Sequence, residues 1–86
     1  MVSKLVKRVN DKIENEKLLY ITMDCDGSTI NNAVVPDMIS VEDEEIYVEG
    51  GNLMLHITNE KKFQVDYDDS EEEFVIKQGD TTYYIS

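Results

Sequence analysis

Residues 44–57 constrain the fold most strongly, because two alternating apolar and polar runs flank Gly50-Gly51 there. A Gly-Gly pair supplies the positive φ angles that a two-residue turn requires, so this stretch predicts a β-hairpin. With Gly50-Gly51 as the turn, the apolar side chains gather on one face, as a half-buried antiparallel pair demands. The expected cross-strand pairs are Val48 with Leu53, Ile46 with Leu55, Tyr47 with Met54 and Glu45 with His56.

Two further turn signals predict a hairpin on either side of this one. Asp26-Gly27 would join strands at about 18–23 and 29–35, and Gly79-Asp80 would close the last hairpin. Pro36 has no backbone N–H, so it is expected at a bend or a sheet edge. The expected pairs are Met23 with Ile30, Leu19 with Val34, Ile21 with Asn32, Ile76 with Tyr83, Phe74 with Ile85 and Val75 with Tyr84.

One helix is predicted, at residues 2–16. Its apolar side chains recur at helical spacing and form a single stripe, which comprises Val2, Leu5, Val6, Val9 and Ile13. Ser3 is a candidate N-cap, although no Glu follows three positions later to complete a capping box. A helix this short is not stable alone, so its stripe is expected to lie on the sheet.

The remaining segments complete the expected fold. Residues 38–41 and 62–67 alternate as strands do, and the acidic segments 42–44 and 68–73 are expected as a turn and a loop. The 86 residues therefore predict a single α+β domain, with the helix followed by an antiparallel β-meander over residues 18–86. The sheet would be curved, or a partly open barrel, with six to eight short strands in hairpin order.

Composition favours a folded protein of a reducing compartment. The hydrophobic fraction of 41% is enough for a core, so the chain is not expected to be disordered. Cys25 is the only cysteine, which excludes an internal disulfide, and no signal-peptide pattern is present, so a cytoplasmic location is expected. No apolar run approaches the roughly 20 residues of a membrane span.

The charge is strongly negative and unevenly distributed. The chain has 19 acidic and 8 basic residues, for a net charge of −11. Residues 1–17 hold five bases and three acids, whereas residues 18–86 hold three bases and 16 acids. Such a domain should repel nucleic acid and anionic membranes and attract basic surfaces, so direct contact with nucleic acid or membrane is not expected.

Few residues point to catalysis or metal binding. Residues 24–28 (Asp-Cys-Asp-Gly-Ser) match an EF-hand loop poorly, because such a loop needs acids at alternating positions over twelve residues, a Gly at the sixth and a Glu at the twelfth. A tight turn explains Asp26-Gly27. His56, the only histidine, is expected on the solvated face opposite Glu45. The chain has no phosphate-binding loop, nucleophile elbow or HExxH motif. We therefore expect a non-enzymatic protein with no catalytic residues, cofactor or metal.

Two acidic runs, residues 42–45 and 66–73, are the most unusual feature. Acids in turns keep small β-proteins soluble and discourage edge pairing, but that role does not explain why no Lys or Arg occurs between residues 18 and 60. A second interpretation is that carboxylates on a rigid sheet replace phosphates in a basic groove. The candidate partner-binding residues are Glu42, Asp43, Glu44, Glu45, Asp68, Asp69, Glu71, Glu72 and Glu73, with Tyr47 and Met54 as apolar anchors.

This composition resembles the small acidic inhibitors that phages make against host nucleases, including anti-restriction and anti-CRISPR proteins. The resemblance is compositional and covers no aligned stretch. It implies an inhibitor that mimics nucleic acid, whose partner is a protein with a basic surface, such as a nucleic-acid-binding enzyme.

The alternative function is a structural or assembly module. The helix covers one face of the predicted sheet. On the other face, the predicted registers place five aromatic or apolar side chains, namely Tyr20, Tyr47, Met54, Val75 and Tyr84. An exposed apolar patch of this kind would form a homodimer or dock in a larger complex. If the sheet curls, the same side chains would instead form a second core.

Overall fold

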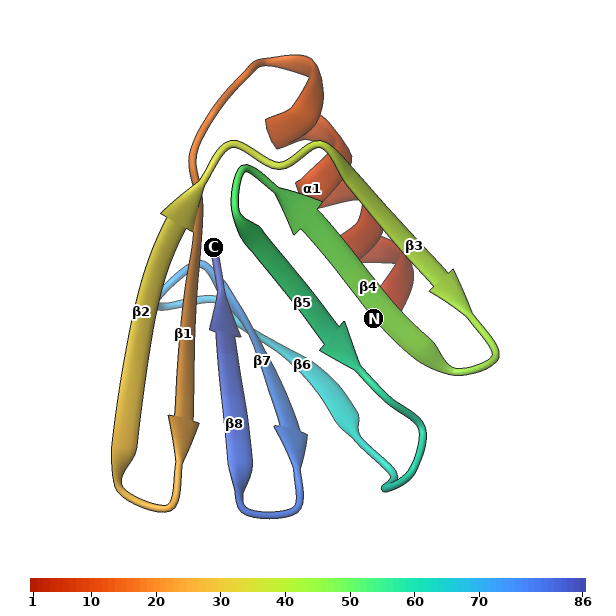
Figure 1. The fold of residues 1–86 in the computed structure, drawn as a ribbon, viewed down its shortest axis with the longest axis vertical. Helices are drawn as coiled ribbons and strands as arrows, with labels where there is room; N and C mark the ends of the chain where they lie inside the picture. Colours follow the sequence, from red (N-terminus) through yellow and green to blue (C-terminus); the bar gives the residue numbers. More distant parts are fainter.

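The structure, a computed structural model, describes residues 1–86 as one helix followed by eight antiparallel strands in two sheets (Figure 1). The elements are α1 (Val2–Glu14), β1 (Leu19–Cys25), β2 (Ser28–Val34), β3 (Met38–Glu42), β4 (Glu45–Gly50), β5 (Leu53–Ile57), β6 (Gln64–Asp68), β7 (Glu73–Gln78) and β8 (Thr81–Ile85). This architecture confirms the predicted α+β class, and the strands do not close into a barrel.

The strand order divides the chain into two hairpin groups. The larger sheet has the order β2-β1-β8-β7-β6, and the smaller sheet has the order β3-β4-β5. All neighbouring strands are consecutive along the chain except β1 and β8, which pair although one is the first strand and the other the last. The meander expected over residues 18–86 is therefore interrupted twice, because β3, β4 and β5 leave the larger sheet to form their own.

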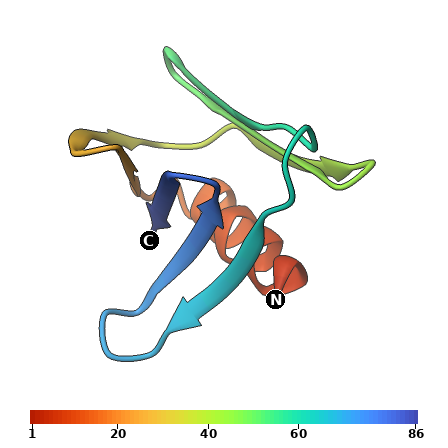
Figure 2. The ribbon, with the colours of Figure 1, turned by 90° about the horizontal axis from the view of Figure 1, so that it is seen from below.

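The core lies between the two sheets, and α1 contributes to it. Leu5 and Val9 of the helix are completely buried, together with Ile46 of β4 and Ile76 of β7. Figure 2 shows α1 between the smaller sheet and the larger one. The predicted apolar stripe is therefore buried as expected, but it packs between two sheets rather than on one face of a single sheet. No helix is long and apolar enough to cross a membrane.

Both ends of α1 differ from the prediction. Met1 occupies the N-cap position and makes no side-chain capping bond, and Ser3 lies inside the first turn, so the N-cap prediction is wrong. At the other end, the Asn15 side-chain amide donates to the Asp11 carbonyl at 2.8 Å. Glu16 then has a φ of 51°, which is incompatible with a right-handed helix, so α1 ends before it.

The registers of the first and last hairpins are confirmed. The turns lie at Asp26-Gly27 and Gly79-Asp80, and Pro36 lies between β2 and β3, outside the strands. The observed pairs include Leu19 with Val34, Ile21 with Asn32, Met23 with Ile30, Phe74 with Ile85, Val75 with Tyr84 and Ile76 with Tyr83.

The register of the central hairpin differs from the prediction. Gly50 belongs to β4 and pairs with Leu53, so the turn residues are Gly51 and Asn52. A Cβ on Gly50 would lie 2.7 Å from the Val35 carbonyl oxygen, which explains why a strand position needs glycine here. Gly51 has a φ of 54°, as the first position of a II′ turn requires. The observed pairs are Gly50 with Leu53, Glu49 with Met54, Val48 with Leu55, Tyr47 with His56 and Ile46 with Ile57. The register is shifted by two residues, so every side chain keeps its predicted face.

Candidate partner-binding surface

Three cross-strand rows of side chains cover the face of β3-β4-β5 that points away from the core. The rows are Glu42 with Glu45, Ser40 with Tyr47 and His56, and Met38 with Glu49 and Met54. The alternate residues of β4, Ile46 and Val48, are buried beneath them. We call these rows, together with the turn residues Asp43 and Glu44, the acidic sheet face. It gathers Glu42, Asp43, Glu44, Glu45, Tyr47 and Met54 of the predicted site on one surface.

The β3–β4 turn holds one of its acidic residues, Glu44, in a strained conformation. Asp43 and Glu44 have φ angles of 51° and 61°, so both turn residues are left-handed. A two-residue turn of this type accepts Asn, Asp or Gly at its first position and favours Gly at its second, so Asp43 fits the turn whereas Glu44 costs roughly 1 kcal/mol. The chain therefore keeps a glutamate at a turn position where glycine would be more stable.

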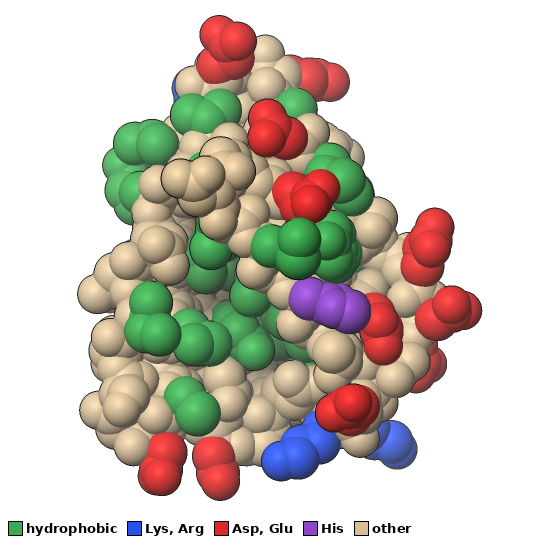
Figure 3. Space-filling view, in the orientation of Figure 1, with side chains coloured by type: hydrophobic (Ala, Val, Ile, Leu, Met, Phe, Trp, Pro, Cys, Tyr) green, Lys and Arg blue, Asp and Glu red, His purple; other side chains and the backbone are tan.

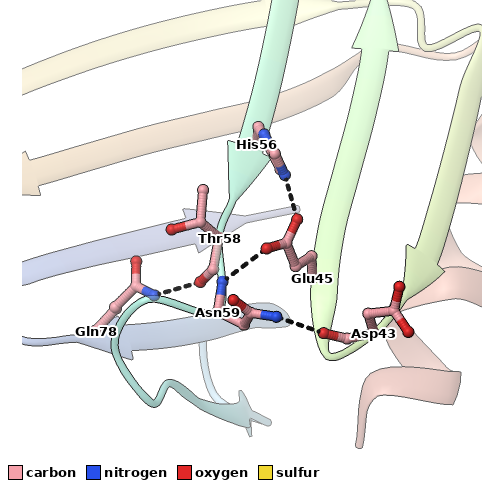
Figure 4. Close-up of polar contacts among 6 residues, drawn as sticks. All are labelled: Asp43, Glu45, His56, Thr58, Asn59 and Gln78. Atoms are coloured by element: carbon pink, nitrogen blue, oxygen red, sulfur yellow. Dashed lines mark hydrogen bonds and ion pairs between the residues drawn. The ribbon is translucent and has the colours of Figure 1, made fainter.

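Glu45 is fixed in place by residues of two other segments (Figure 4). Its Oε1 atom lies 2.8 Å from His56 Nε2, and its Oε2 atom accepts the backbone N–H of Asn59 at 3.1 Å. The Asn59 side-chain amide donates to the Asp43 carbonyl at 2.9 Å. The predicted proximity of Glu45 and His56 is therefore confirmed, although the two residues are diagonal rather than directly paired. These bonds connect the acidic turn to β5 and to the loop that follows it.

A second contact ties the same region to the larger sheet. The Gln78 side-chain amide, at the end of β7, donates to the Thr58 carbonyl at 2.7 Å (Figure 4). It also donates to the Lys61 carbonyl at 2.9 Å. The loop after β5 is thereby held against the β7–β8 hairpin. Asn59, which braces the acidic turn, belongs to this loop, so the orientation of the turn is coupled to both sheets.

Hydrogen bonding and burial shift two pKa values on the acidic sheet face in opposite directions. The bond from His56, followed by the Asn59 N–H, lowers the pKa of the Glu45 carboxyl, so it remains charged at neutral pH. Desolvation, with the nearby Glu49 carboxylate, raises the pKa of the Tyr47 phenol. The Tyr47 and His56 rings meet edge to face with centroids 5.3 Å apart.

The second acidic run lies elsewhere. Residues 68–73 form the end of β6, the β6–β7 turn and the start of β7, and Figures 1 and 2 show this turn on the opposite side of the molecule from the β3–β4 turn. The Ser70 hydroxyl donates to Asp68 at 2.7 Å and lowers the pKa of that carboxyl. The partly buried Glu73 has a raised pKa, chiefly because of desolvation. The structure therefore does not join Asp68, Asp69, Glu71, Glu72 and Glu73 to the acidic sheet face.

The expected Tyr and Met patch is also divided. Tyr20, Val75 and Tyr84 lie on the outer face of the five-stranded sheet, whereas Tyr47 and Met54 lie on the acidic sheet face. Tyr20 is 53% exposed and Met54 61%, so these side chains do not form a second core. The prediction of one continuous patch is wrong, because the chain builds two sheets rather than one.

Most basic residues lie away from the acidic sheet face, but Lys61 and Lys62 line a surface pocket together with its turn residues Asp43 and Glu44. On the side of the molecule drawn in Figure 3, acidic side chains are spread over the surface, and Lys and Arg gather mainly at the lower edge. Five bases belong to residues 1–17, around α1. Arg8 lies 5.6 Å from the ring centroid of Tyr67 and 5.4 Å from that of Phe74, and it donates to the Tyr67 hydroxyl. This arginine packs against β6 and β7 and does not neutralise the acidic sheet face.

The residues considered for metal binding or nucleophilic chemistry lie apart. Cys25 accepts a hydrogen bond from the Thr81 hydroxyl at 3.4 Å in the larger sheet, whereas His56 contacts Glu45 in the smaller one. Asp26-Gly27 forms the β1–β2 turn, as expected. No group of three or more His, Cys, Asp or Glu side chains is arranged to hold a metal ion.

Sequence reasoning missed three residues of this region. Glu49 shares a face with Tyr47 because the two are two positions apart on one strand, so strict alternation would have found it. Met38 joins them only through the β3–β4 register. Asn59 acts through the conformation of a loop, for which the local sequence carries no signal.

No protein-family model matches this sequence, and neither the curated proteins nor the solved structures gave a match. Function is therefore inferred from the geometry and charge of the chain itself.

Proposed function

We propose that this is a non-enzymatic inhibitor that docks its acidic sheet face onto the basic surface of another protein. The partner is a nucleic-acid-binding protein, and the carboxylates take the positions of phosphates. This function belongs to the same class as the phage anti-restriction and anti-CRISPR inhibitors that the composition resembles.

The end of the β3–β4 hairpin carries this proposal. Glu42 and Glu45 lie directly opposite each other, an arrangement that is destabilising for like charges. The adjoining Asp43 and Glu44 both occupy the left-handed region. Local strain of this kind concentrates at functional sites. A Lys or Arg from a partner would relieve the repulsion between the two carboxylates, so the unfavourable feature of the free protein becomes favourable on binding.

The remainder of the acidic sheet face has the composition of an interface. Met54 is 61% exposed beside Glu49, and Tyr47 occupies the middle strand. Tyr and Met are enriched at the centres of protein interfaces, where they contribute apolar contact inside a polar rim. Here the carboxylates supply that rim, and the bonds to Glu45 hold it in place before binding, which lowers the entropy lost on association.

The test compares two matched variants that remove the same charge without changing side-chain shape. The hairpin variant is Glu42→Gln/Asp43→Asn/Glu44→Gln, and the control is Asp69→Asn/Glu71→Gln/Glu72→Gln in the β6–β7 turn. Proteins captured from a bacterial lysate by tagged wild type at low salt are then measured for affinity to each variant. We expect the hairpin variant to bind about 10- to 100-fold more weakly, because three exposed charge pairs contribute roughly 0.5–1 kcal/mol each.

The control variant should bind the partner as the wild type does. Duplex DNA should compete with the wild type for the captured protein, because both ligands would occupy one basic groove. Equal weakening by both variants would indicate a nonspecific effect of net charge, and undiminished binding by the hairpin variant would exclude the carboxylates at the hairpin end as the site.

A second candidate function, assembly through the apolar part of the same face, is favoured by the exposure of Met54. In that case Tyr47→Ser or Met54→Ser would abolish association, and binding would be insensitive to salt. The hairpin variant would then retain full affinity.

A further inference from the structure

Strand β2 forms an edge of the larger sheet that lacks the usual protection against pairing with another strand. Its sequence, Ser-Thr-Ile-Asn-Asn-Ala-Val, contains no ionisable residue and no proline, and all of it is exposed except the half-buried Val34. The other three edge strands each carry an ionisable side chain, Glu42 in β3, His56 in β5 and Asp66 in β6. Natural proteins blunt free edges with charge, proline or bulges, so an uncharged seven-residue edge in a chain of net charge −11 is unusual.

The hydrogen-bonding groups of this edge can be assigned from the neighbouring strands. The Tyr20 carbonyl in β1 accepts the Ser86 N–H on the β8 side, so the backbone groups of Tyr20 point away from β2. Its cross-strand partner Ala33 therefore points its own N–H and C=O away from β1, toward solvent. By the same alternation, Thr29 and Asn31 also present free N–H and C=O groups at the edge.

We infer that β2 pairs antiparallel with β2 of a second copy, joining two five-stranded sheets into one continuous sheet. Charge favours this occupant over others. Two copies repel each other wherever their acidic surfaces meet, but β2 places no like charge opposite itself. A basic strand from another protein would find no acidic side chain to pair with along this edge. An uncharged strand needs no such partner, and β2 of a second copy is uncharged in the same way.

One register satisfies all the free groups. With Asn31 opposite Asn31 of the second copy, Thr29 lies opposite Ala33, and these three residues exchange N–H and C=O bonds in both directions. Ile30, which is 51% exposed in the monomer, then lies diagonal to Ile30 and Val34 of the second copy, within reach of both. The pairing thus covers the one large apolar side chain of the strand that is exposed in the monomer.

The interface is small, below the roughly 1,200 Å² of standard complexes, so we expect a weak dimer with a dissociation constant on the order of micromolar or above. Salt should strengthen it, because screening reduces the repulsion between two chains of net charge −11. The proposed partner binding through the acidic sheet face has the opposite salt dependence, and that face lies on the other sheet. Failure of one proposal is therefore distinguishable from failure of the other.

The test is the molar mass in solution by sedimentation equilibrium, across protein concentration and at low and high salt. The wild type should approach twice its 9.9 kDa monomer mass at high concentration and high salt. Ile30→Lys places a charge on the edge, and Ala33→Pro removes a free N–H and blocks strand pairing. Both variants should stay monomeric. Met54→Lys adds the same charge to an exposed residue of the other sheet and should dimerise as the wild type does.

Circular dichroism and urea unfolding establish that each variant is folded. If Ala33→Pro does not fold, Ile30→Lys decides the matter, because Ile30 is half exposed and tolerates a long polar side chain. A wild type that remains monomeric at the highest soluble concentration and high salt would overturn the inference. So would a dimer that persists in Ile30→Lys, or one that Met54→Lys abolishes, since the last result would place the dimer on the acidic sheet face.

Discussion

Glu42 and Glu45 lie directly opposite each other at the end of the β3–β4 hairpin, and both side chains are on the face that points away from the core. Two carboxylates opposite each other repel, and the turn between them is strained as well. Like charges directly opposite each other destabilise a hairpin, and this pair lies at the end of the hairpin where we propose that a basic partner binds.

Replacing Glu42 with Gln should stabilise the protein, because it removes the repulsion and keeps the side-chain shape. We expect the free energy of unfolding to rise by about 0.2–1 kcal/mol at low salt, measured by urea denaturation at neutral pH. The gain should shrink at high salt, where the repulsion is already screened. A variant that is less stable than the wild type would show that Glu42 makes a favourable contact instead.

Replacing Asp43-Glu44 with Asn-Gly should stabilise the same hairpin through the backbone. Asn and Gly accept the φ angles of 51° and 61° with less strain, so we expect a gain of about 1 kcal/mol. The Asn59 bond to the carbonyl of residue 43 does not depend on the side chain there and should remain. The same variant should bind the partner more weakly, having lost two carboxylates. Improved binding would contradict the proposed role of these acids.

Stability should depend on pH through Glu45. Its folded-state pKa lies below the ordinary value of 4.5, so the ionised carboxylate stabilises the native state above that pH. This contribution is lost as the pH falls through the lowered folded-state pKa. The difference in unfolding free energy between wild type and Glu45→Gln should therefore decrease as the pH falls below 4.5. The exposed Glu60→Gln provides a control, since no hydrogen bond to the Glu60 side chain is present. A difference that does not vary with pH would exclude this contribution.

Gly50 should be intolerant of substitution because of a backbone contact rather than its turn position. A Cβ there would lie 2.7 Å from the Val35 carbonyl oxygen and 2.8 Å from Pro36 Cα, so Gly50→Ala should cost about 3 kcal/mol. Gly27→Ala is the comparison, because it has a φ of 86° but no atom within 4 Å of a new Cβ, and should cost about 1 kcal/mol. Equal costs in thermal unfolding would show that the segment before β3 moves aside.

Local chemistry made the hairpins predictable. Asp26-Gly27 and Gly79-Asp80 specified both turn position and register, because only one two-residue turn matched the alternation on either side. The central hairpin offered two candidate turns, and alternation could not distinguish them because a shift by two residues keeps every side chain on its face. In the observed register Gly50 packs closely against the Val35-Pro36 segment, and that contact is not visible in the local pattern.

Long-range arrangement was not predictable from the same signals. Pairing of β1 with β8 joins residues at opposite ends of the chain, and no turn chemistry links them. The two acidic runs are prominent in the sequence, yet they lie on opposite sides of the molecule because β3 and β4 belong to a different sheet from β6 and β7. Alternation placed Glu45 and Tyr47 on one face, but it could not show that residues 68–73 are separate from them.

The most direct test of the proposed function is the salt dependence of partner binding, measured with the captured protein by titration calorimetry. The wild type should lose affinity steeply as salt rises, with a linear relation between the logarithms of affinity and salt concentration, as for a ligand that replaces phosphates. The variant Glu42→Gln/Asp43→Asn/Glu44→Gln should show a shallower slope. An affinity that is unchanged between low and high salt, in the wild type and in the variant alike, would contradict binding through carboxylates.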